Sequence, residues 1–219
     1  MKSIIAATLL VCFFAVTSSE LQCEHTQLDI PKEWKDMAYP CISKMRSQVE
    51  EELKAAMQYM AMGAHFSKDT VNRPGFAKFF FKAASEEREH AIKIISYLLM
   101  RGELTSKVSD LIKKKCKLLI ILTPRLTSWA NGVSALKDAL RLEAFVTRKI
   151  RDIIAVCESN PTQFNDYHLV DYLTADFLGE QYHGQRDLAG KISTLEKLMG
   201  QHGPLGEFLF DKKLLNDEL

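Results

Sequence analysis

Four polar residues interrupt apolar helical seams in this chain, each at a position where a helix should present only hydrophobic side chains to a core. Three are carboxylates, Glu52, Glu87 and Glu143, and the fourth is Gln181. Around each of them, apolar residues recur mostly at alternating spacings of three and four, which is typical of the inward face of an amphipathic helix. The four seams are Met45, Val49, Glu52, Ala56, Tyr59; Phe80, Ala84, Glu87, Ala91, Ile94; Leu136, Ala139, Glu143, Val146, Ile150; and Leu173, Phe177, Gln181, Gly184, Leu188.

The three seam carboxylates require a source of positive charge. A buried ion without a partner costs several kcal/mol, because it loses its water and gains nothing in return. No lysine or arginine lies on the four seams. We therefore expect a metal ion between the helices.

The bulk composition fits a helical globular protein. The 219 residues suit one domain or at most two, and a hydrophobic content of 47% with 10 Gly and 6 Pro suits a packed helical core. The net charge is near +1 and no nucleic-acid-binding motif is present. We expect neither a nucleic acid nor a membrane as a partner.

The first residues predict a secretory signal peptide, residues 1–19. Lys2 is followed by an apolar run from Ile4 to Ala15, and the small residues Thr17 and Ser19 permit cleavage before Glu20. The run is shorter than the roughly 20 residues that a membrane-spanning helix needs. The mature chain then begins with a polar N-terminal extension, residues 20–40.

The rest of the chain predicts one helical domain, residues 41–215, followed by a short tail, residues 216–219. Pro74 suits a first helical turn, Gly102 a helix end, and Asn160-Pro161 a stop. We expect helices over residues 41–66, 74–100, 128–158, 165 or 166 to 199, and 204–214.

The lengths of the links predict the topology. Helices one and two are joined by a few residues, as are helices three and four, so each pair is antiparallel. The link between helices two and three is about 25 residues, long enough to travel the length of a bundle. The fold class is therefore all-α, a four-helix bundle with one long crossover and a short fifth helix.

Entry into the secretory pathway permits disulfides. Cys41 begins the first helix and Cys157 ends the third, and the topology places these two ends at the same end of the bundle. A Cys41–Cys157 bridge is one expectation; two buried thiols are the alternative. Cys23 is free to pair with another subunit, and Cys116 is left over.

Several seam residues share a face in a way that suits iron. Glu87 and His90 are three residues apart, and Glu52 and Tyr59 are seven apart, so each pair projects from one side of its helix. Three carboxylates and one imidazole suit a cation such as Fe(II). A bridging carboxylate, for which Glu87 is best placed, would hold two iron ions close together, so that oxygen takes one electron from each.

The motifs that carry these residues resemble those of the ferritin family, heavy-chain type. The resemblance rests on Ser85-Glu86-Glu87-Arg88-Glu89-His90, Glu52-Leu53 with Tyr59, Leu142-Glu143, Glu180-Gln181, and the closing run Leu205 to Lys212. The signal peptide, the cysteine-bearing extension and Asp69 to Phe76 resemble the secreted heavy-chain members of insects. The resemblance covers nearly all of the mature chain.

The resemblance implies a ferritin-like bundle that stores iron and oxidises Fe(II) with O2 at a ferroxidase centre, with two iron ions per subunit. It assigns Glu52, Glu87 and His90 to the first iron, Glu87, Glu143 and Tyr59 to the second, Gln181 beside the second, and Glu86 to a transit position. Light-type subunits lack this set and are disfavoured. The implied assembly is a multi-subunit shell of 24 chains, formed with copies of itself and with a light-type partner.

Two other function classes remain open. The chain could be a structural shell subunit with a vestigial centre, or a monomeric or dimeric di-iron oxygenase. The apolar last helix argues against the oxygenase, because a lone bundle has no use for it. A local alternative also remains, since Glu180 and His183 form an E-x-x-H pair that could supply ligands, although the seam through Gln181 and Gly184 places both on its flanks.

The sequence departs from the family pattern at several places. The segment Lys113 to Leu122 lengthens the crossover, either as a clamp on a neighbouring subunit or through an error in the gene prediction. Asp171 matches one acidic pore position, but Thr174 replaces the second. Lys78, Phe81, Lys82 and Ser85 stand where light-type subunits carry mineral-nucleating acids, so that mineral growth would need a second subunit type or released ferric clusters.

The chain ends in Asn216-Asp217-Glu218-Leu219, which resembles a KDEL-type retention signal. The protein is therefore expected in the secretory pathway, with retention in the ER or Golgi and onward secretion both open.

Overall fold

The computed structural model describes residues 31–103, 123–158 and 165–219. Within these residues the secondary structure is entirely helical. The elements are η1 (Lys32–Trp34), α1 (Tyr39–Ser67), α2 (Pro74–Met100), α5 (Gly132–Glu158), α6 (Tyr167–Tyr172), η2 (Leu173–Leu178), α7 (Gly179–His202) and α8 (Pro204–Leu215). The signal peptide, Cys23, the segment Lys113 to Leu122 with Cys116, and Asn160-Pro161 lie outside the described residues.

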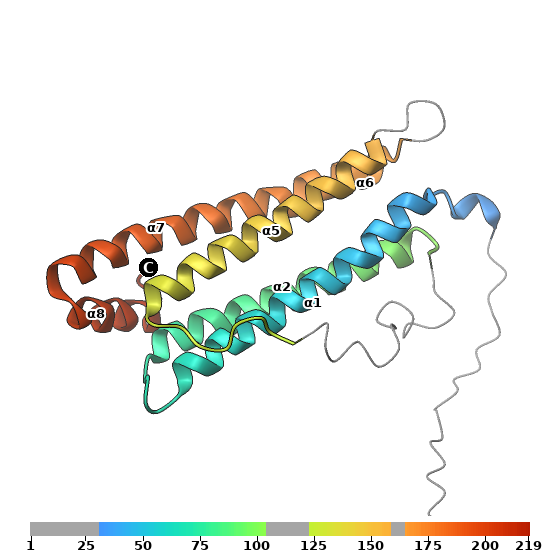
Figure 1. Ribbon diagram of the computed structural model, residues 1–219. Helices are drawn as coiled ribbons and strands as arrows, with labels where there is room; N and C mark the ends of the chain where they lie inside the picture. The colour runs from blue at the N-terminus through green and yellow to red at the C-terminus, as the bar shows by residue number, and fades with distance from the viewer. Residues whose placement is uncertain (1–30, 104–122, 159–164) are drawn as a thin grey trace, which may run out of the picture.

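The long helices form two antiparallel pairs (Figure 1). α1 packs along α2, α5 packs along the run from α6 to α7, and α1 and α5 join the two pairs. α2 and α5 run in the same direction, as the length of the link between them predicts. The predicted all-α bundle with one long crossover and a short last helix is confirmed. None of the described helices is long and apolar enough to span a membrane.

Two apolar clusters fill the bundle, one toward each end. One includes Met45, Ile94 and Ile150, and the other contains stacked aromatic rings such as Phe66 and Phe76. The seam carboxylates lie along the same helix faces between residues of the two clusters. The polar centre therefore lies between two sets of close-packed hydrophobic side chains, which close it off along the bundle axis.

The Cys41–Cys157 disulfide is present and joins the start of α1 to the end of α5, with the two Cα atoms 5.5 Å apart. At the same end, Arg101 contacts Asp36 and Asp166 at 2.7 and 2.8 Å. Asp166 also accepts a hydrogen bond from the Leu169 amide and caps α6. Of the two residues expected to cap the fourth helix, Asp166 is the one that does so.

Several helix boundaries differ from the sequence prediction, since α1 spans Tyr39–Ser67 rather than 41–66 and the fourth helix reaches His202 rather than 199. α5 begins at Gly132 rather than Ser128. Asn131 explains the later start, because its side chain accepts a hydrogen bond from the Ser134 amide at 2.9 Å, as an N-cap does. The predicted fourth helix is also not uniform, since a π-helical segment, η2, separates α6 from α7.

The π-helical segment keeps one face of the fourth helix turned inward. Leu169, Leu173, Phe177 and Gln181 are all buried and are spaced by four residues each time. In a regular α-helix, each step of four would rotate the seam by about 40°. The wider turn of η2 removes part of that rotation. The expectation that Gly184 continues the seam was wrong, because Gly184 is exposed and the next buried position is Leu188.

The short helix α8 closes the end of the bundle by capping two other helices. Glu207 accepts hydrogen bonds from the Gly132 amide at the start of α5, at 2.9 Å, and from Arg73 just before α2, at 3.1 Å. Asp211 accepts one from the Phe76 amide, near the start of α2, at 3.0 Å. These amides have no partner inside their own helices, so acidic residues of α8 satisfy them.

Candidate metal centre

Three side chains from two helices converge in the middle of the bundle. Glu52 comes from α1, and Glu87 and His90 come from α2. One ligand atom from each lies within 4.8 Å of the others. The relative exposures are 0% for Glu52, 3% for Glu87 and 5% for His90. The 3-residue spacing of Glu87 and His90 places both on one helix face, as the sequence indicates.

The atoms that face one another in this cluster have no hydrogen-bond partner. They are Glu52 Oε2, Glu87 Oε2 and His90 Nδ1, all buried. His90 Nδ1 lies 4.0 Å from Glu52 Oε2 and 3.8 Å from Glu87 Oε2, too far for a hydrogen bond. The other oxygen of Glu52 accepts a hydrogen bond from Gln48 at 2.8 Å. A hydrogen bond from outside the cluster therefore orients Glu52, while the three atoms that face the middle of the cluster have no hydrogen-bond partner.

Burial and mutual repulsion hold protons on these carboxyl groups. Burial, with the neighbouring Glu87, raises the pKa of Glu52 well above its ordinary value. Burial, with the neighbouring Glu143, raises the pKa of Glu87 to about 8. Among the described residues, no lysine or arginine forms an ion pair with any of these three glutamates. A cation that entered the cluster would replace protons rather than another protein charge.

Glu143 and Tyr59 extend the cluster toward α5. The Tyr59 hydroxyl donates a hydrogen bond to Glu143 Oε1. Burial, with Glu143 nearby, raises the pKa of Tyr59 well above its ordinary value, so the phenol remains a neutral donor. Burial also raises the pKa of Glu143, although hydrogen bonds from Tyr59 and Gln181 act in the opposite direction.

Gln181 reaches the same region from α7. Its Oε1 lies 2.8 Å from Thr147 Oγ1, and the Thr147 hydroxyl also lies 2.8 Å from the backbone oxygen of Glu143. Gln185 donates to Thr147 Oγ1 at 2.6 Å. The Thr147 hydroxyl has one proton for Gln181 Oε1 and the Glu143 backbone oxygen, so it donates to one of them at a time, and Gln181 hydrogen-bonds to the Glu143 carboxylate as well.

Glu86 lies outside the buried cluster, in a groove that leads to it. The groove has a volume of about 340 Å³ and is lined by Tyr59 and Glu143 at the centre and by Glu86. Glu86 is exposed and 3.6 Å from Lys82 Nζ. Its carboxylate therefore lies between solvent and the pair Tyr59 and Glu143. The same groove is also lined by Lys78, Lys191 and Leu219.

The E-x-x-H pair of α7 does not join the three-residue cluster. His183 is exposed, and the Glu180 side chain is 50% exposed. Glu180 does reach the other ring nitrogen of His90, with Oε2 and Nε2 3.3 Å apart. Both residues lie on the flanks of the seam, as the sequence indicates.

Sequence reasoning missed the residues that orient the centre. Gln48 is one turn before Glu52, Thr147 is one turn after Glu143, and Gln185 is one turn after Gln181. Each is a hydrogen-bonding residue at a spacing of four from a candidate ligand. That spacing is a signal that the sequence contains, because residues four apart on a helix are neighbours.

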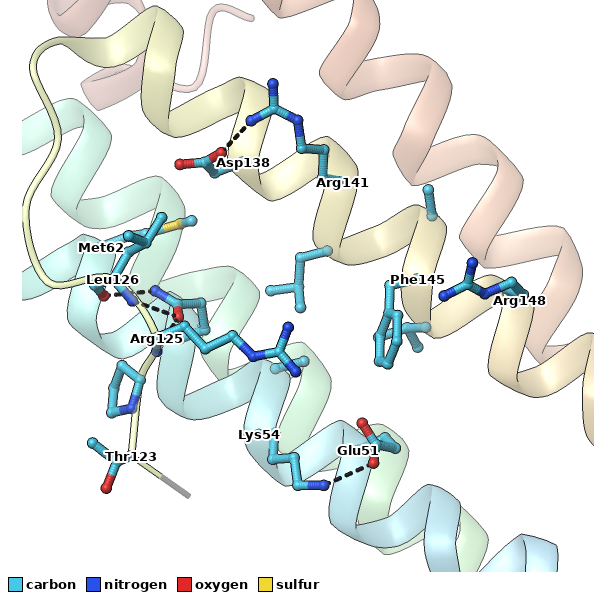
Figure 2. Close-up of a pocket in the computed structure, with 16 residues that line it drawn as sticks. Glu51, Lys54, Met62, Thr123, Arg125, Leu126, Asp138, Arg141, Phe145 and Arg148 are labelled. Carbon is cyan, nitrogen blue, oxygen red and sulfur yellow. Dashed lines mark hydrogen bonds and ion pairs between the residues drawn. The ribbon is translucent and has the colours of Figure 1, made fainter. Parts of the chain in front are cut away.

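A larger pocket lies away from this chemistry. It has a volume of about 780 Å³ and opens between α1, α5 and the segment before α5. Figure 2 shows that its acidic side chains are already paired, Glu51 with Lys54 and Asp138 with Arg141. None of the six central side chains lines it; these are Glu52, Tyr59, Glu87, His90, Glu143 and Gln181. Volume alone would therefore locate the wrong site.

The described residues at the expected pore and mineral-nucleation positions are on the surface. Asp171 on α6 and Thr174 on η2 are both exposed. Lys78, Lys82 and Ser85 are exposed on α2, and Phe81 is 41% exposed. These side chains therefore form part of the exposed face of α2.

Comparisons with known proteins agree on one family. The ferritin family, described as Ferritin-like domain, matches residues 42–198. The ferritin heavy chain of Trichoplusia ni is 57% identical over 212 residues, which is 97% of this chain and 95% of the relative. The ferritin heavy chain of Drosophila melanogaster is 52% identical and covers 98% and 100%. The crystal structure of Trichoplusia ni secreted ferritin has a TM-score of 0.81 at 59% identity, covering 89% of this chain and 98% of that one.

Proposed function

This chain belongs to the ferritin family, and on that premise we propose that the central cluster is the ferroxidase centre of a heavy-type, iron-storing subunit. Ferritin heavy chains oxidise Fe(II) and store the product. The observation that carries the assignment of the site is the set of three buried, inward-facing atoms without hydrogen-bond partners, Glu52 Oε2, Glu87 Oε2 and His90 Nδ1. Buried polar atoms in proteins are usually hydrogen-bonded, so three that face one another across one space favour a cation between them.

The first iron ion is bound by Glu52, Glu87 and His90. Two carboxylate oxygens and one neutral imidazole nitrogen suit Fe(II), which accepts both oxygen and nitrogen ligands. Gln48 orients the Glu52 carboxylate by binding its other oxygen. Binding displaces the protons that burial holds on Glu52 and Glu87 near neutral pH.

The second iron ion lies between Glu87 and Glu143, with Glu87 as the bridge. The Tyr59 hydroxyl binds Glu143 Oε1 and orients the carboxylate from the side. Gln181 stands beside this ion and is held by Thr147. Glu86 receives iron in the groove and passes it inward, since the groove reaches both Tyr59 and Glu143.

Two neighbouring Fe(II) ions would supply two electrons to one O2 molecule, so that each iron becomes Fe(III) and the O2, with two protons, leaves as hydrogen peroxide. The protein supplies acidic ligands that stabilise the higher charge of Fe(III), and the apolar clusters on both sides exclude bulk water. The ferric product then leaves the centre for storage.

The subunit assembles into a closed shell, which we propose contains 24 chains and includes a light-type partner. The lysines on the exposed face of α2 support a division of labour, because this chain lacks the acids that would nucleate mineral there. Residues 1–19 direct the chain into the secretory pathway, Cys23 is available for a bridge to another subunit, and the tail Asn216 to Leu219 governs retention or release.

The test is a rapid oxidation measurement on the assembled protein. Metal-free protein is mixed with about two Fe(II) per chain, oxygen is admitted, and the absorbance of the ferric product is followed. The double variant Glu87→Lys, His90→Gly removes the bridge and the imidazole. We expect fast oxidation in the natural protein and loss of the fast phase in the variant, with the shell intact by sedimentation.

Glu89→Gln is the matched control. Glu89 is the neighbour of His90 on α2 but is exposed, so its replacement should leave the fast phase unchanged. Oxidation in the natural protein that is no faster than in the double variant would leave the structural-subunit alternative in its place.

A further inference from the structure

Glu180 is not among the six central side chains, yet it touches one of them from outside. Its Oε2 lies 3.3 Å from His90 Nε2 and 3.5 Å from Lys93 Nζ. His90 and Lys93 are three residues apart on α2, so Glu180 of α7 is held between two neighbours on one helix face. The contact links the cluster of Glu52, Glu87 and His90 to the fourth helix.

His90 uses its two ring nitrogens on opposite sides. Nδ1 is buried, has no hydrogen-bond partner and faces Glu52 and Glu87. Nε2 faces Glu180. A neutral imidazole carries one proton, and the nitrogen without it is the one that binds a metal. The position of that proton therefore decides whether Nδ1 is available.

We propose that Glu180 is a positioning residue that holds the proton of His90 on Nε2 and so presents the bare Nδ1 to the metal centre. A carboxylate accepts a hydrogen bond and cannot donate one when ionised, so it selects the tautomer with the proton on Nε2. The inference rests on the proposed ferroxidase centre, because it concerns how one of its ligands is prepared.

The surroundings of Glu180 support an ionised carboxylate in this role. The Lys93 ammonium lies 3.5 Å from Glu180 Oε2 and the Glu180 side chain is half exposed to solvent, and both conditions favour the charged carboxylate. The Phe177 ring of η2 packs against the imidazole with centroids 5.7 Å apart and blocks rotation of the ring on that side. Glu180 thus sets the tautomer while Phe177 restricts the ring.

The same geometry separates positioning from direct ligation. Glu180 meets His90 on the side away from the unpartnered atoms, and its side chain is half exposed. A carboxylate on that side cannot share an ion with Glu52 and Glu87 without displacing the imidazole. The E-x-x-H pair of α7 therefore contributes an orienting group, and His183, exposed on the next turn, contributes nothing to it.

The experiment compares the natural protein with Glu180→Ala, Glu180→Gln and the control Glu89→Gln, all as assembled shells. The first readout is ¹⁵N solid-state NMR of histidine-labelled, metal-free protein, with His90 assigned from a His90→Gln spectrum. The natural protein and the control should show protonated Nε2 and bare Nδ1. Glu180→Ala should show a mixture of the two tautomers, and Glu180→Gln, which keeps an acceptor oxygen, should fall between them.

The second readout is Co(II) binding, measured by calorimetry and by visible absorption. An orienting partner of a ligating histidine typically affects metal affinity by about 10- to 100-fold. We expect a dissociation constant raised at least about tenfold in Glu180→Ala, less in Glu180→Gln and not at all in Glu89→Gln. The number of Co(II) bound and the absorption spectrum should stay unchanged, because no ligand is removed.

Each other outcome overturns the proposal. An unchanged His90 tautomer with unchanged Co(II) affinity would show that Glu180 has no positioning role. An altered Co(II) spectrum or a lost equivalent of Co(II) in Glu180→Ala would show that Glu180 is itself a ligand. Failure of the proposed function is seen separately, in the natural protein, which would then neither bind Co(II) at this centre nor oxidise Fe(II) rapidly.

Discussion

Glu87 in the middle of the bundle and Glu207 at its end are both buried carboxylates, but they are partnered in opposite ways. Glu207 has a partner on each oxygen, Arg73 at 3.1 Å and the Gly132 amide at 2.9 Å. Glu87 Oε2 has none, and its pKa is raised to about 8 by burial and by Glu143. Glu207 therefore holds helices together, whereas Glu87 has an oxygen that a bound cation would pair with.

For Glu87 and Glu207, this contrast distinguishes a functional acid from a structural one. Burial alone does not distinguish them, since Glu207 is 8% exposed and Glu87 is 3% exposed. The difference lies in how many of their hydrogen-bonding positions the fold fills. Four variants or conditions test this difference, beginning with the largest expected effect.

Glu87→Gln should nearly abolish rapid oxidation while leaving the fold intact. The variant keeps the shape of the side chain but loses the charge that bridges two iron ions, so the initial rate should fall at least about 100-fold. The free energy of unfolding at neutral pH should be unchanged or slightly higher, because a buried acid without a partner is replaced by a neutral amide. Stopped-flow absorbance and guanidinium unfolding measure the two quantities; a strong loss of stability would contradict the assignment.

The stability of the metal-free protein should fall as pH rises toward 8. Folded Glu87 keeps its proton up to about pH 8, whereas the unfolded group has the ordinary value of 4.5. Between these values the folded state binds more protons, so the free energy of unfolding decreases with increasing pH and levels off above the window. Unfolding curves from about pH 5 to about pH 9 measure this slope, which should be smaller in Glu87→Gln. A slope of the opposite sign would mean that the central carboxyl groups are ionised when folded.

Glu207→Ala should produce the reverse pattern, a loss of stability without a loss of chemistry. Removing a helix cap and its charged hydrogen bond should cost about 1–3 kcal/mol. The rate of oxidation per assembled subunit should not change, because Glu207 is remote from the centre. Glu196→Ala is the matched control, since its ion pair with Lys137 is exposed on both sides and should be worth less than about 1 kcal/mol. Equal losses of unfolding free energy in the two variants would show that Glu207 stabilises the fold no more than an exposed ion pair does.

Thr147→Val should have the smallest effect. It removes the hydroxyl that holds Gln181 and keeps the volume of the side chain. We expect a loss of about 1 kcal/mol or less in the affinity of the second metal position, up to about fivefold. Co(II) titration would resolve binding of the second ion. An unchanged dissociation constant for that ion would show that the contact between Thr147 and Gln181 does not support the second metal position.

Much of this architecture could be read from spacing. Three seams are buried at every predicted position, including Glu52, Glu87 and Glu143, because the pattern of threes and fours reports one face of a regular helix. The fourth seam was only partly predictable. Its π-helical segment changes the number of residues per turn, so the expectation for Gly184 failed where the helix stopped being regular.

The orienting residues of the centre were the harder part. Gln48, Thr147 and Gln185 are ordinary polar residues in the sequence, and many others resemble them. Their importance depends on which atom they meet, and the sequence does not contain that information. The start of α5 shows the same limit, since Asn131 acts as a cap only because the chain turns there.

The sequence alone determined which side chains share a helix face, that three of them are acids on an apolar seam, and that a long link lets the third helix run parallel to the second. These follow from helical periodicity and from the reach of a polypeptide. Only the tertiary structure decided which buried oxygens remain without partners, and which ring nitrogen of His90 faces inward. The physical reason is that a hydrogen bond depends on tenths of an ångström and on direction, and these are fixed only when separate helices pack against one another.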